Sequence, residues 1–394
     1  MRNLRAAATA ILLGTAALGA GAALQPALAA VSSAVGKPLQ EAASLAAAGK
    51  YREAMERANT AAAAAKTAEE HSKADQMKQY IAIKSGDSSI GGALGAKAKF
   101  ANDANAQRWK DVIADGDALA KNNALDGQSQ LVIAQAYYMS HDPKGCIGYI
   151  KRHGLGGETA LLTLQRCAYD AQDEDTQRSA LEQLVASTGK AEHWKSLLHL
   201  AERARGLKDH NTLDIFRIKQ MTGTIDPADI VLYATFAIQF KSPAEAKSVV
   251  EKAIADKTIN ADDRNNRLLK TANDRLNEYN AGFGKTMSDA QKAPKGDDLV
   301  HIGEFQIGAG KAKDAIATIQ AGIAKGLVDE GEGQLRLGAA YLAAGQKADA
   351  IKAFNAVKGD DKEVMVAHLY SIAARSEASA AKAPADAPAK KHRK

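Results

Sequence analysis

The stretch Gln334–Val357, QLRLGAAYLAAGQKADAIKAFNAV, decides the fold of this chain. Its apolar residues recur at three- and four-residue spacing on both sides of a central glycine, which is typical of two amphipathic helices joined by a turn. The small residues Gly338 and Ala350 lie on either side of Gly345. The stretch therefore predicts a helical hairpin.

The same three- and four-residue spacing of apolar residues runs through most of the chain. Alanine is abundant among the 394 residues, aromatic residues make up only 5%, and prolines number eight. Stretches that alternate with period two and are rich in Val, Ile and Thr, as strands would be, are hard to find. We therefore expect an all-α protein.

The pattern of the hairpin returns elsewhere in the sequence. Upstream it reappears with Gly303, Gly310 and Ala315. Other pairs of small residues at the same separation are Ala234 with Ala246, Ala134 with Cys146, and Ala42 with Ala54, the last with a turn expected at Gly49. Any single copy could be an unrelated helical pair, because Ala and Gly are common here. Their recurrence favours stacked repeats, since a lone hairpin cannot bury its apolar face.

The strongest copy resembles the tetratricopeptide repeat (TPR), a pair of antiparallel helices. The resemblance implies that Gly338 and Ala350 are small because the helices cross there, while Tyr341 and Phe354 fill the space beside the hairpin. The resemblance covers most of 38–375. The chain is most similar to periplasmic TPR proteins of Gram-negative bacteria in His193–Gly223, in Pro243–Ala253 and in the two final repeats. The resemblance implies a TPR-like α-solenoid of antiparallel hairpins, wound as a right-handed superhelix.

The repeats divide the chain into segments. We expect TPR-like hairpins at 30–125 and central repeats at 126–257. An irregular helical hairpin should occupy 258–295, where the pattern does not fix the register. C-terminal repeats and a capping helix with a polar outer side should fill 296–375.

The first residues have the order of a secretory signal. Arg2 and Arg5 precede an uncharged stretch of Ala, Leu and Gly, and small residues around Ala29 offer a cleavage site. We predict a signal peptide at 1–29, with an uncleaved membrane anchor as the alternative. Cleavage would release a soluble periplasmic protein without stable membrane insertion.

The segment 376–394 consists mainly of Ala, Pro, Lys and Ser, which predicts a disordered tail. The net charge of +6 resides mainly in the two ends, because Arg2 and Arg5 give +2 and the tail gives +3. The nearly neutral body does not indicate nucleic-acid binding. The tail is either a solvated end or a contact for an anionic surface such as a membrane or a cell-wall polymer.

The two cysteines lie on helices expected at 143–153 and 157–172. Antiparallel packing would place Cys146 beside Cys167, and a bond between them would stabilise the protein by about 3 kcal/mol. The alternative is a pair of buried thiols in a helix interface.

Catalytic, cofactor-binding and metal-binding patterns are not found. Gly308–Lys311 lacks the first glycine and the hydroxyl of a phosphate-binding loop, and neither it nor the glycine-rich stretch 91–95 follows a predicted strand. We expect the latter to be a loosely packed helix. The nine histidines do not form pairs at metal-ligand spacing, and a nucleophile elbow is missing. We therefore expect a protein that is not an enzyme.

The TPR resemblance implies that the first helix of each pair lines a concave groove. Transferring its contact positions predicts a binding groove that includes Gln135, Tyr138, Lys195, His199, Arg203, Thr235, Ile238 and Glu304. Each could instead contact only a neighbouring helix. The mixture suits a protein or peptide segment of the cell envelope, so we predict an interaction scaffold or adaptor. The alternative is an envelope attachment or spacer protein that contacts peptidoglycan or membrane through its basic tail.

Overall fold

The computed structural model describes residues 31–380, which form nineteen α-helices and no strand. The prediction of an all-α helical repeat fold is therefore confirmed. The predicted signal peptide and the tail beyond residue 380 lie outside the described residues. No helix within 31–380 combines the length and the apolar character that crossing a bilayer requires.

The chain divides into two compact units, residues 1–140 and 141–394. The boundary falls after Ser140, inside the range 126–257 that we predicted as a single block. The last helix before the boundary packs against the helix that precedes it, which places it in the first unit.

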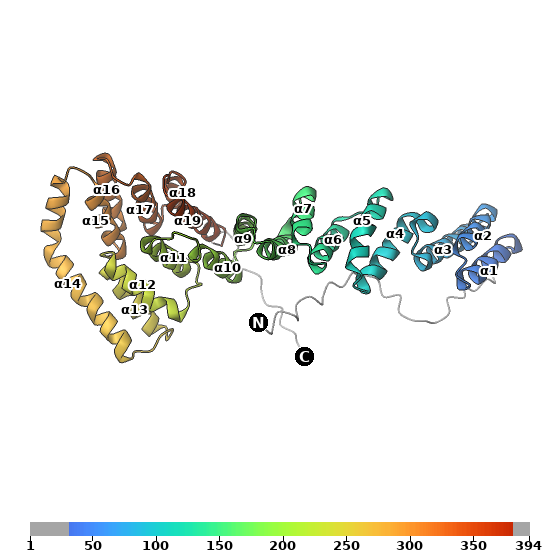
Figure 1. Ribbon diagram of the computed structural model, residues 1–394, viewed down its shortest axis with the longest axis horizontal. Coiled ribbons are helices and arrows are strands. Elements are labelled where there is room, and N and C mark those ends of the chain that lie inside the picture. Colours follow the sequence, from blue (N-terminus) through green and yellow to red (C-terminus); the bar gives the residue numbers. More distant parts are fainter. Residues whose placement is uncertain (1–30, 381–394) are drawn as a thin grey trace. The chain divides into compact units, whose positions relative to one another are not determined.

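The first unit is a stack of six described helices, each packed against the next (Figure 1). They are α1 (Ser33–Ala47), α2 (Tyr51–Ala64), α3 (Ala68–Ser85), α4 (Ser88–Asn105), α5 (Trp109–Lys121) and α6 (Gly127–Met139). Helices two apart, such as α1 and α3, also touch, as expected of repeats that stack on their neighbours.

Small residues allow α1 and α2 to pack closely. Ala42 and Ala54, the pair identified in the sequence, are both completely buried where the two helices meet. Gly49 turns the chain between them with φ of +77°, a conformation that residues with a side chain rarely adopt. The first predicted hairpin therefore has the expected turn and crossing.

The glycine-rich stretch 91–95 is tightly packed, so the expectation of a loose helix is wrong. A Cβ on Gly91 would lie 2.6 Å from the Cβ of Ala82, and one on Gly95 would lie 2.3 Å from the carbonyl oxygen of Asp87. At Gly92 the helix α4 kinks, with φ of 54° and ψ of −133°. Here the glycines permit close approach of backbone to backbone.

The second unit contains the remaining helices (Figure 1). They are α7 (Pro143–His153), α8 (Gly157–Asp170), α9 (Glu174–Thr188), α10 (Ala191–Glu202), α11 (Asp209–Met221), α12 (Pro227–Gln239), α13 (Pro243–Ala255), α14 (Asp263–Lys292), α15 (Asp297–Gly308), α16 (Ala312–Ala324), α17 (Glu330–Ala343), α18 (Lys347–Asn355) and α19 (Asp361–Ala380). A disulfide between Cys146 and Cys167 joins α7 to α8.

The hairpin predicted at 258–295 is wrong, because this segment forms the single 30-residue helix α14. The ring of Tyr279 on this helix stacks on Phe305 of α15, with ring centroids 3.9 Å apart. Leu268 and Leu269, nearer its start, pack against the core formed by α12 and α13. One long helix thus spans the distance between two hairpins.

The predicted close crossings occur in the two C-terminal hairpins. A Cβ on Gly338 would lie 2.5 Å from Cδ1 of Phe354, so α17 and α18 approach closely only because position 338 has no side chain. Gly303 of α15 faces Ile319 of α16 in the same way. These contacts agree with the crossing positions inferred from the sequence.

The last helix does more than cap the end of the array. Residues of α19 such as Leu369 and Ile372 share one core with Leu184 of α9 and Ile215 of α11. The expected polar outer side is present at the exposed residues Asp361, His368 and Arg375, while the other faces of α19 are buried between α18 and the earlier helices. It also continues to Ala380, into the segment predicted as a disordered tail. The second unit thus closes on itself.

Candidate binding site

The structure separates the predicted groove residues into three groups. Gln135 and Tyr138 lie on α6 in the first unit and are half-buried. In the second unit, Lys195, His199 and Arg203 are exposed along α10 and at its C-terminus. Thr235 is exposed on α12, Ile238 is half-buried there, and Glu304 is buried on α15.

The exposed residues of α10 and α12 belong to neighbouring helices. The ammonium of Lys195 lies 2.8 Å from the carboxylate of Asp226, which precedes the first residue of α12. Lys219 of α11 forms a second link, because it pairs with Glu202 of α10 and with Asp229 of α12. We define the α10–α12 surface as the exposed residues Lys195, His199, Arg203, Leu232 and Thr235.

This surface carries groups that are available to a partner. The side chain of His199 is 70% exposed, and Leu232, one turn before Thr235, is 52% exposed. Arg203 is exposed and forms no ion pair with a described residue. The α10–α12 surface therefore exposes a free cation on the α10 side and an apolar side chain on α12.

Glu304 is not a groove residue of this kind. Its side chain is 3% exposed, and its Oε1 accepts hydrogen bonds from Arg217 at 2.8 Å and from His210 at 3.1 Å. Its prediction as an open contact position is thus wrong. Burial and internal pairing place it in a different part of the unit.

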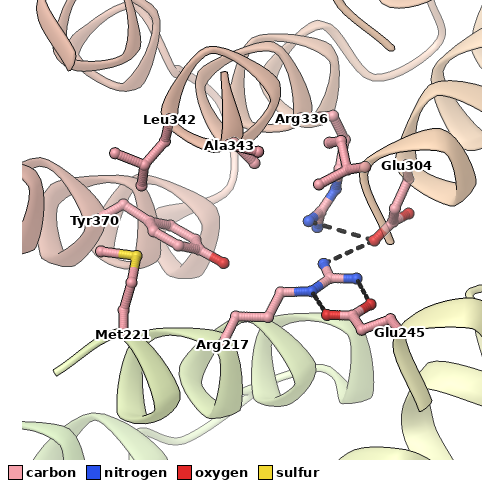
Figure 2. Close-up of a pocket in the computed structure, with 10 residues that line it drawn as sticks. Arg217, Met221, Glu245, Glu304, Arg336, Leu342, Ala343 and Tyr370 are labelled. Atoms are coloured by element: carbon pink, nitrogen blue, oxygen red, sulfur yellow. Dashed lines mark hydrogen bonds and ion pairs between the residues drawn. The ribbon is translucent and has the colours of Figure 1, made fainter. Parts of the chain in front are cut away.

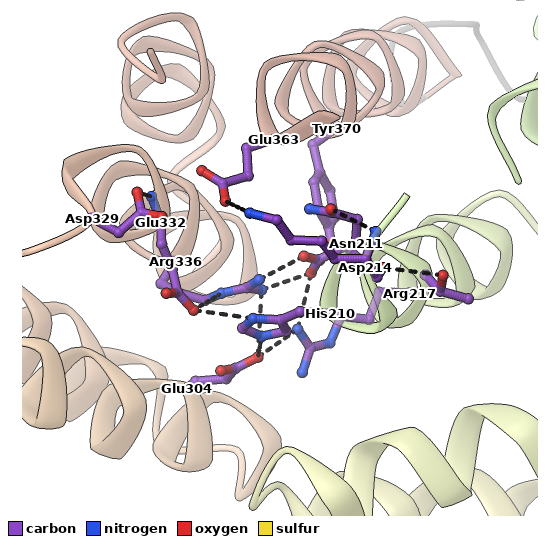
Figure 3. Close-up of polar contacts among 12 residues, drawn as sticks. His210, Asn211, Asp214, Arg217, Glu304, Asp329, Glu332, Arg336, Glu363 and Tyr370 are labelled. Carbon is purple, nitrogen blue, oxygen red and sulfur yellow. Dashed lines mark hydrogen bonds and ion pairs between the residues drawn. The ribbon is translucent and has the colours of Figure 1, made fainter. Parts of the chain in front are cut away.

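Glu304 belongs to a buried charge cluster where α11, α15 and α17 meet (Figure 3). We define the charge cluster as His210, Asp214, Arg217, Glu304, Glu332 and Arg336. At its centre Arg336 donates to both carboxylate oxygens of Asp214, at 2.6 Å each. Arg217 donates to Asp214 at 3.0 Å. Charges so deeply buried require paired partners of this kind.

The cluster fixes the ionisation of its members. Burial and the charge of Arg336 act to lower the pKa of His210, but its contacts with Glu304 and Glu332 outweigh both and raise it to about 9. Burial acts to raise the pKa of Glu304, yet Arg336 and Arg217 hold it well below its usual range. At neutral pH the imidazole is therefore protonated and the carboxylate is ionised.

His210, Glu304 and Glu332 lie close enough together to be considered as metal ligands. The Nε2 of His210 faces Glu304 and its Nδ1 faces Glu332, each at 3.1 Å, so both nitrogens of the imidazolium are engaged. Arg336 adds a further cation to the same carboxylates. The donor set therefore forms an ion-pair network and does not fit a metal, which requires neutral imidazole.

A second group, Glu158, Glu192 and His193, has similar spacing. The ammonium of Lys190 pairs with the Glu158 oxygen that also contacts His193. The carboxylate oxygen that this group would offer to a metal is therefore already paired with a cation.

A cavity of about 280 Å³ adjoins the charge cluster (Figure 2). Its polar side is formed by Arg217, Glu245, Glu304 and Arg336. Its other walls are apolar, and they come from Met221, Ile307, Ala339, Leu342 and Ala343, with Tyr370 beside them. Helices α11, α13, α15, α17 and α19 all contribute. The cavity is thus amphipathic and lies within the second unit.

Sequence reasoning missed His210, Asp214, Arg217 and Arg336. A signal for two of them was present, because Asp214 lies between Leu213 and Ile215, and Arg336 lies between Leu335 and Leu337. A charge flanked by large apolar residues indicates a buried partner. The identity of that partner could not be read, since it is 122 residues away.

Comparisons with known proteins leave the family open. No family model matches the chain, and no curated protein matches it. Among solved structures, the chain is similar to the TPR domain of P58(IPK), with 14% identity over 88% of this chain and 80% of that one. It is also similar to the APC/C hetero-tetramer Cut9–Hcn1, with 10% identity over 89% and 72%. Both TM-scores are 0.21, too low to support a conclusion, so the fold assignment rests on the helices themselves.

Proposed function

We propose that this chain is a non-enzymatic interaction scaffold of the periplasm that binds a protein segment on its stacked helices. The observation that carries the proposal is the α10–α12 surface, which exposes Arg203 and His199 on the α10 side and Leu232 and Thr235 on α12, two helices that the Lys195–Asp226 ion pair links. A surface formed by packed helices is preorganised, so binding requires little ordering of the scaffold.

The state of the ionisable groups supports a role without chemistry. His210 is held as an imidazolium between two carboxylates, so it cannot accept a proton at neutral pH. The carboxylates of the charge cluster are likewise bound by arginines. The buried pair Cys146 and Cys167, bonded between α7 and α8, is in keeping with an oxidising compartment.

Site-specific photo-crosslinking in the native cell envelope tests this proposal. A photoreactive amino acid at Thr235 should capture a partner, whereas the same residue at Thr271 should not. The two threonines are matched, because both are exposed and each donates its hydroxyl to the carbonyl oxygen four residues earlier. The captured protein is then purified and its affinity for the scaffold is measured directly.

Charge reversal supplies the second arm of the test. Arg203→Glu should weaken binding of the captured protein by roughly tenfold, because it removes a surface cation and introduces repulsion. Arg264→Glu, at an exposed arginine of α14 without an ion pair among the described residues, should leave the affinity unchanged. Equal losses in both variants, or none in either, would exclude the α10–α12 surface as the binding site.

The alternative role, attachment to the envelope, depends on the basic run at residues 390–394, outside the described residues. Truncation after Ala380 keeps α19 intact and removes that run. Loss of peptidoglycan or membrane association on truncation, with crosslinking at Thr235 retained, would assign attachment to the tail. Retention of the association would show that the basic run is not the contact.

A further inference from the structure

The cavity beside the charge cluster separates polar from apolar character. Figure 2 shows Arg217, Glu245, Glu304 and Arg336 gathered on one side, with Met221, Leu342 and Ala343 on the other. A ligand that matched both sides would have a charged or polar head and a short apolar chain. The volume of about 280 Å³ is at the small end of ligand pockets, so the ligand must be small or must be one side chain of a larger molecule.

The charges around the polar side of the cavity determine which sign of charge the head group of a ligand should carry. Together with Glu245, the charge cluster has four carboxylates against three cations, His210, Arg217 and Arg336. One negative charge is therefore in excess among groups that are buried or half-buried. An added cation would balance this excess, and such attraction is strong where solvent screening is weak.

The Nη groups of the arginines are already engaged by internal carboxylates. Arg336 uses both Nη groups on Asp214, and Arg217 donates to Asp214, Glu245 and Glu304. The Nε of Arg336 has no hydrogen-bond partner among the described residues, but it lies 3.9 Å from the carboxylate of Glu332. An incoming anion would have to displace one of these internal carboxylates. By contrast, Oε2 of Glu304 accepts no hydrogen bond from any described residue. The available acceptor thus also favours a cation.

We infer that the cavity binds an alkylammonium group, with the ammonium at the carboxylates of Glu304 and Glu245 and the alkyl chain against Met221 and Leu342. Two sources share this chemistry: a free small amine, or the side chain of a lysine in a bound protein. The inference does not depend on the α10–α12 surface, because the cavity is lined by other residues.

Calorimetric titration of the whole chain tests the site with three probes of equal chain length. Butylammonium chloride should bind saturably, while butyrate and 1-butanol should not, because they carry the wrong charge or none. Nα-acetyl-lysine amide distinguishes the sources. Binding comparable to butylammonium would indicate a lysine side chain, and binding of butylammonium alone would indicate a free amine. Failure of both cations to bind, or preferential binding of butyrate, would overturn the inference.

Two variants locate the site independently. Glu304→Gln removes the acceptor charge and should weaken butylammonium binding by roughly tenfold. Ala339→Leu leaves every charge in place, fills part of the cavity and should weaken it by a similar factor. Ala348→Leu, on an exposed position of α18 outside the cavity, is the matched control and should bind as the unaltered chain does. Unchanged binding in Ala339→Leu, with helical content preserved, would exclude the cavity.

Discussion

At the scale of single residues, the second unit depends on charges that are completely buried. Asp214 has no exposed surface, and it receives hydrogen bonds from Arg336, Arg217 and Tyr370. Removing water from a carboxylate has a large unfavourable free energy, and the hydrogen bonds from these donors offset it. The ion pair between Asp214 and Arg336 also joins α11 to α17, so it contributes to the closure of the unit as well as to its core.

Replacing Arg336 with methionine should therefore strongly destabilise the second unit. The substitution keeps an unbranched apolar chain but leaves Asp214 without its bidentate partner, which should lower the free energy of unfolding by about 3–5 kcal/mol. Urea unfolding followed by circular dichroism measures the change. Arg203→Met, at an exposed arginine, should change stability by less than about 0.5 kcal/mol. Equal stability of the two variants would contradict the role of the buried pair.

Glu363 should make stability depend on pH. Burial, reinforced by the charge of Asp329, raises the pKa of Glu363 from 4.5 to about 7, although Lys208 opposes the shift. Below pH 4.5 the carboxyl is protonated in both states. Between about 4.5 and 7 the unfolded chain releases the proton while the folded chain retains it, so stability falls as pH rises through this window.

Glu363→Gln should remove this dependence. At pH 8 the variant should be more stable by up to about 3 kcal/mol, because the glutamine carries no charge to bury, and at pH 4.5 the difference should vanish. Urea unfolding of both proteins at the two pH values gives the comparison. The titration of His210 is common to both and cancels in the difference. A variant that is less stable at pH 8 would show that the ionised carboxylate is favoured in the folded state.

At the scale of helices, replacing glycine with alanine should change the free energy of unfolding in opposite directions at two positions. In α17 a Cβ at Gly338 would collide with the ring of Phe354, which is stacked on Tyr370 and cannot withdraw freely. In α7 a Cβ at Gly148 would meet nothing within 4 Å. Gly338→Ala should therefore lower the free energy of unfolding by about 1–3 kcal/mol. Gly148→Ala should raise it by about 0.5–1 kcal/mol through helix propensity.

Thermal or urea unfolding of the two variants measures both signs. Stabilisation by Gly338→Ala would mean that α17 and α18 are not in close contact at this position. The crossing assigned to the strongest repeat would then be wrong.

The helices could be predicted from the sequence where their contacts are local. Features that depend on contacts between residues far apart in the chain could not. Gly338 and Gly49 could be assigned because small residues and turns have the same meaning in every hairpin. A hairpin was expected at 258–295, where the pattern did not fix the register, and Gly282 and Gly284 lie inside the single helix found there. The structure keeps α14 continuous because an apolar stripe, which includes Tyr279, stays on one face and packs against α15. Helix propensity alone could not decide between these outcomes.

At the scale of the whole molecule, the two units differ in how their helices are connected. In the first unit each described helix touches only near neighbours along the chain, so stability there is a sum of local interfaces. In the second unit α19 packs on α9 and α11, and the charge cluster joins helices more than 80 residues apart. The candidate site could not be predicted, since this closure brings its residues together.

The two units should therefore unfold in separate transitions, and the chain has a reporter for each. The sequence has two tryptophans, one in each unit. Trp109 is the first residue of α5 in the first unit, and Trp194 is buried in the core of the second. Trp109→Phe and Trp194→Phe each leave one fluorophore, whose urea transition reports one unit. Adding Arg336→Met should lower the midpoint seen by Trp194 and leave the midpoint seen by Trp109 unchanged, because the buried pair lies in the second unit. A common shift of both midpoints would show that the units unfold as one cooperative body.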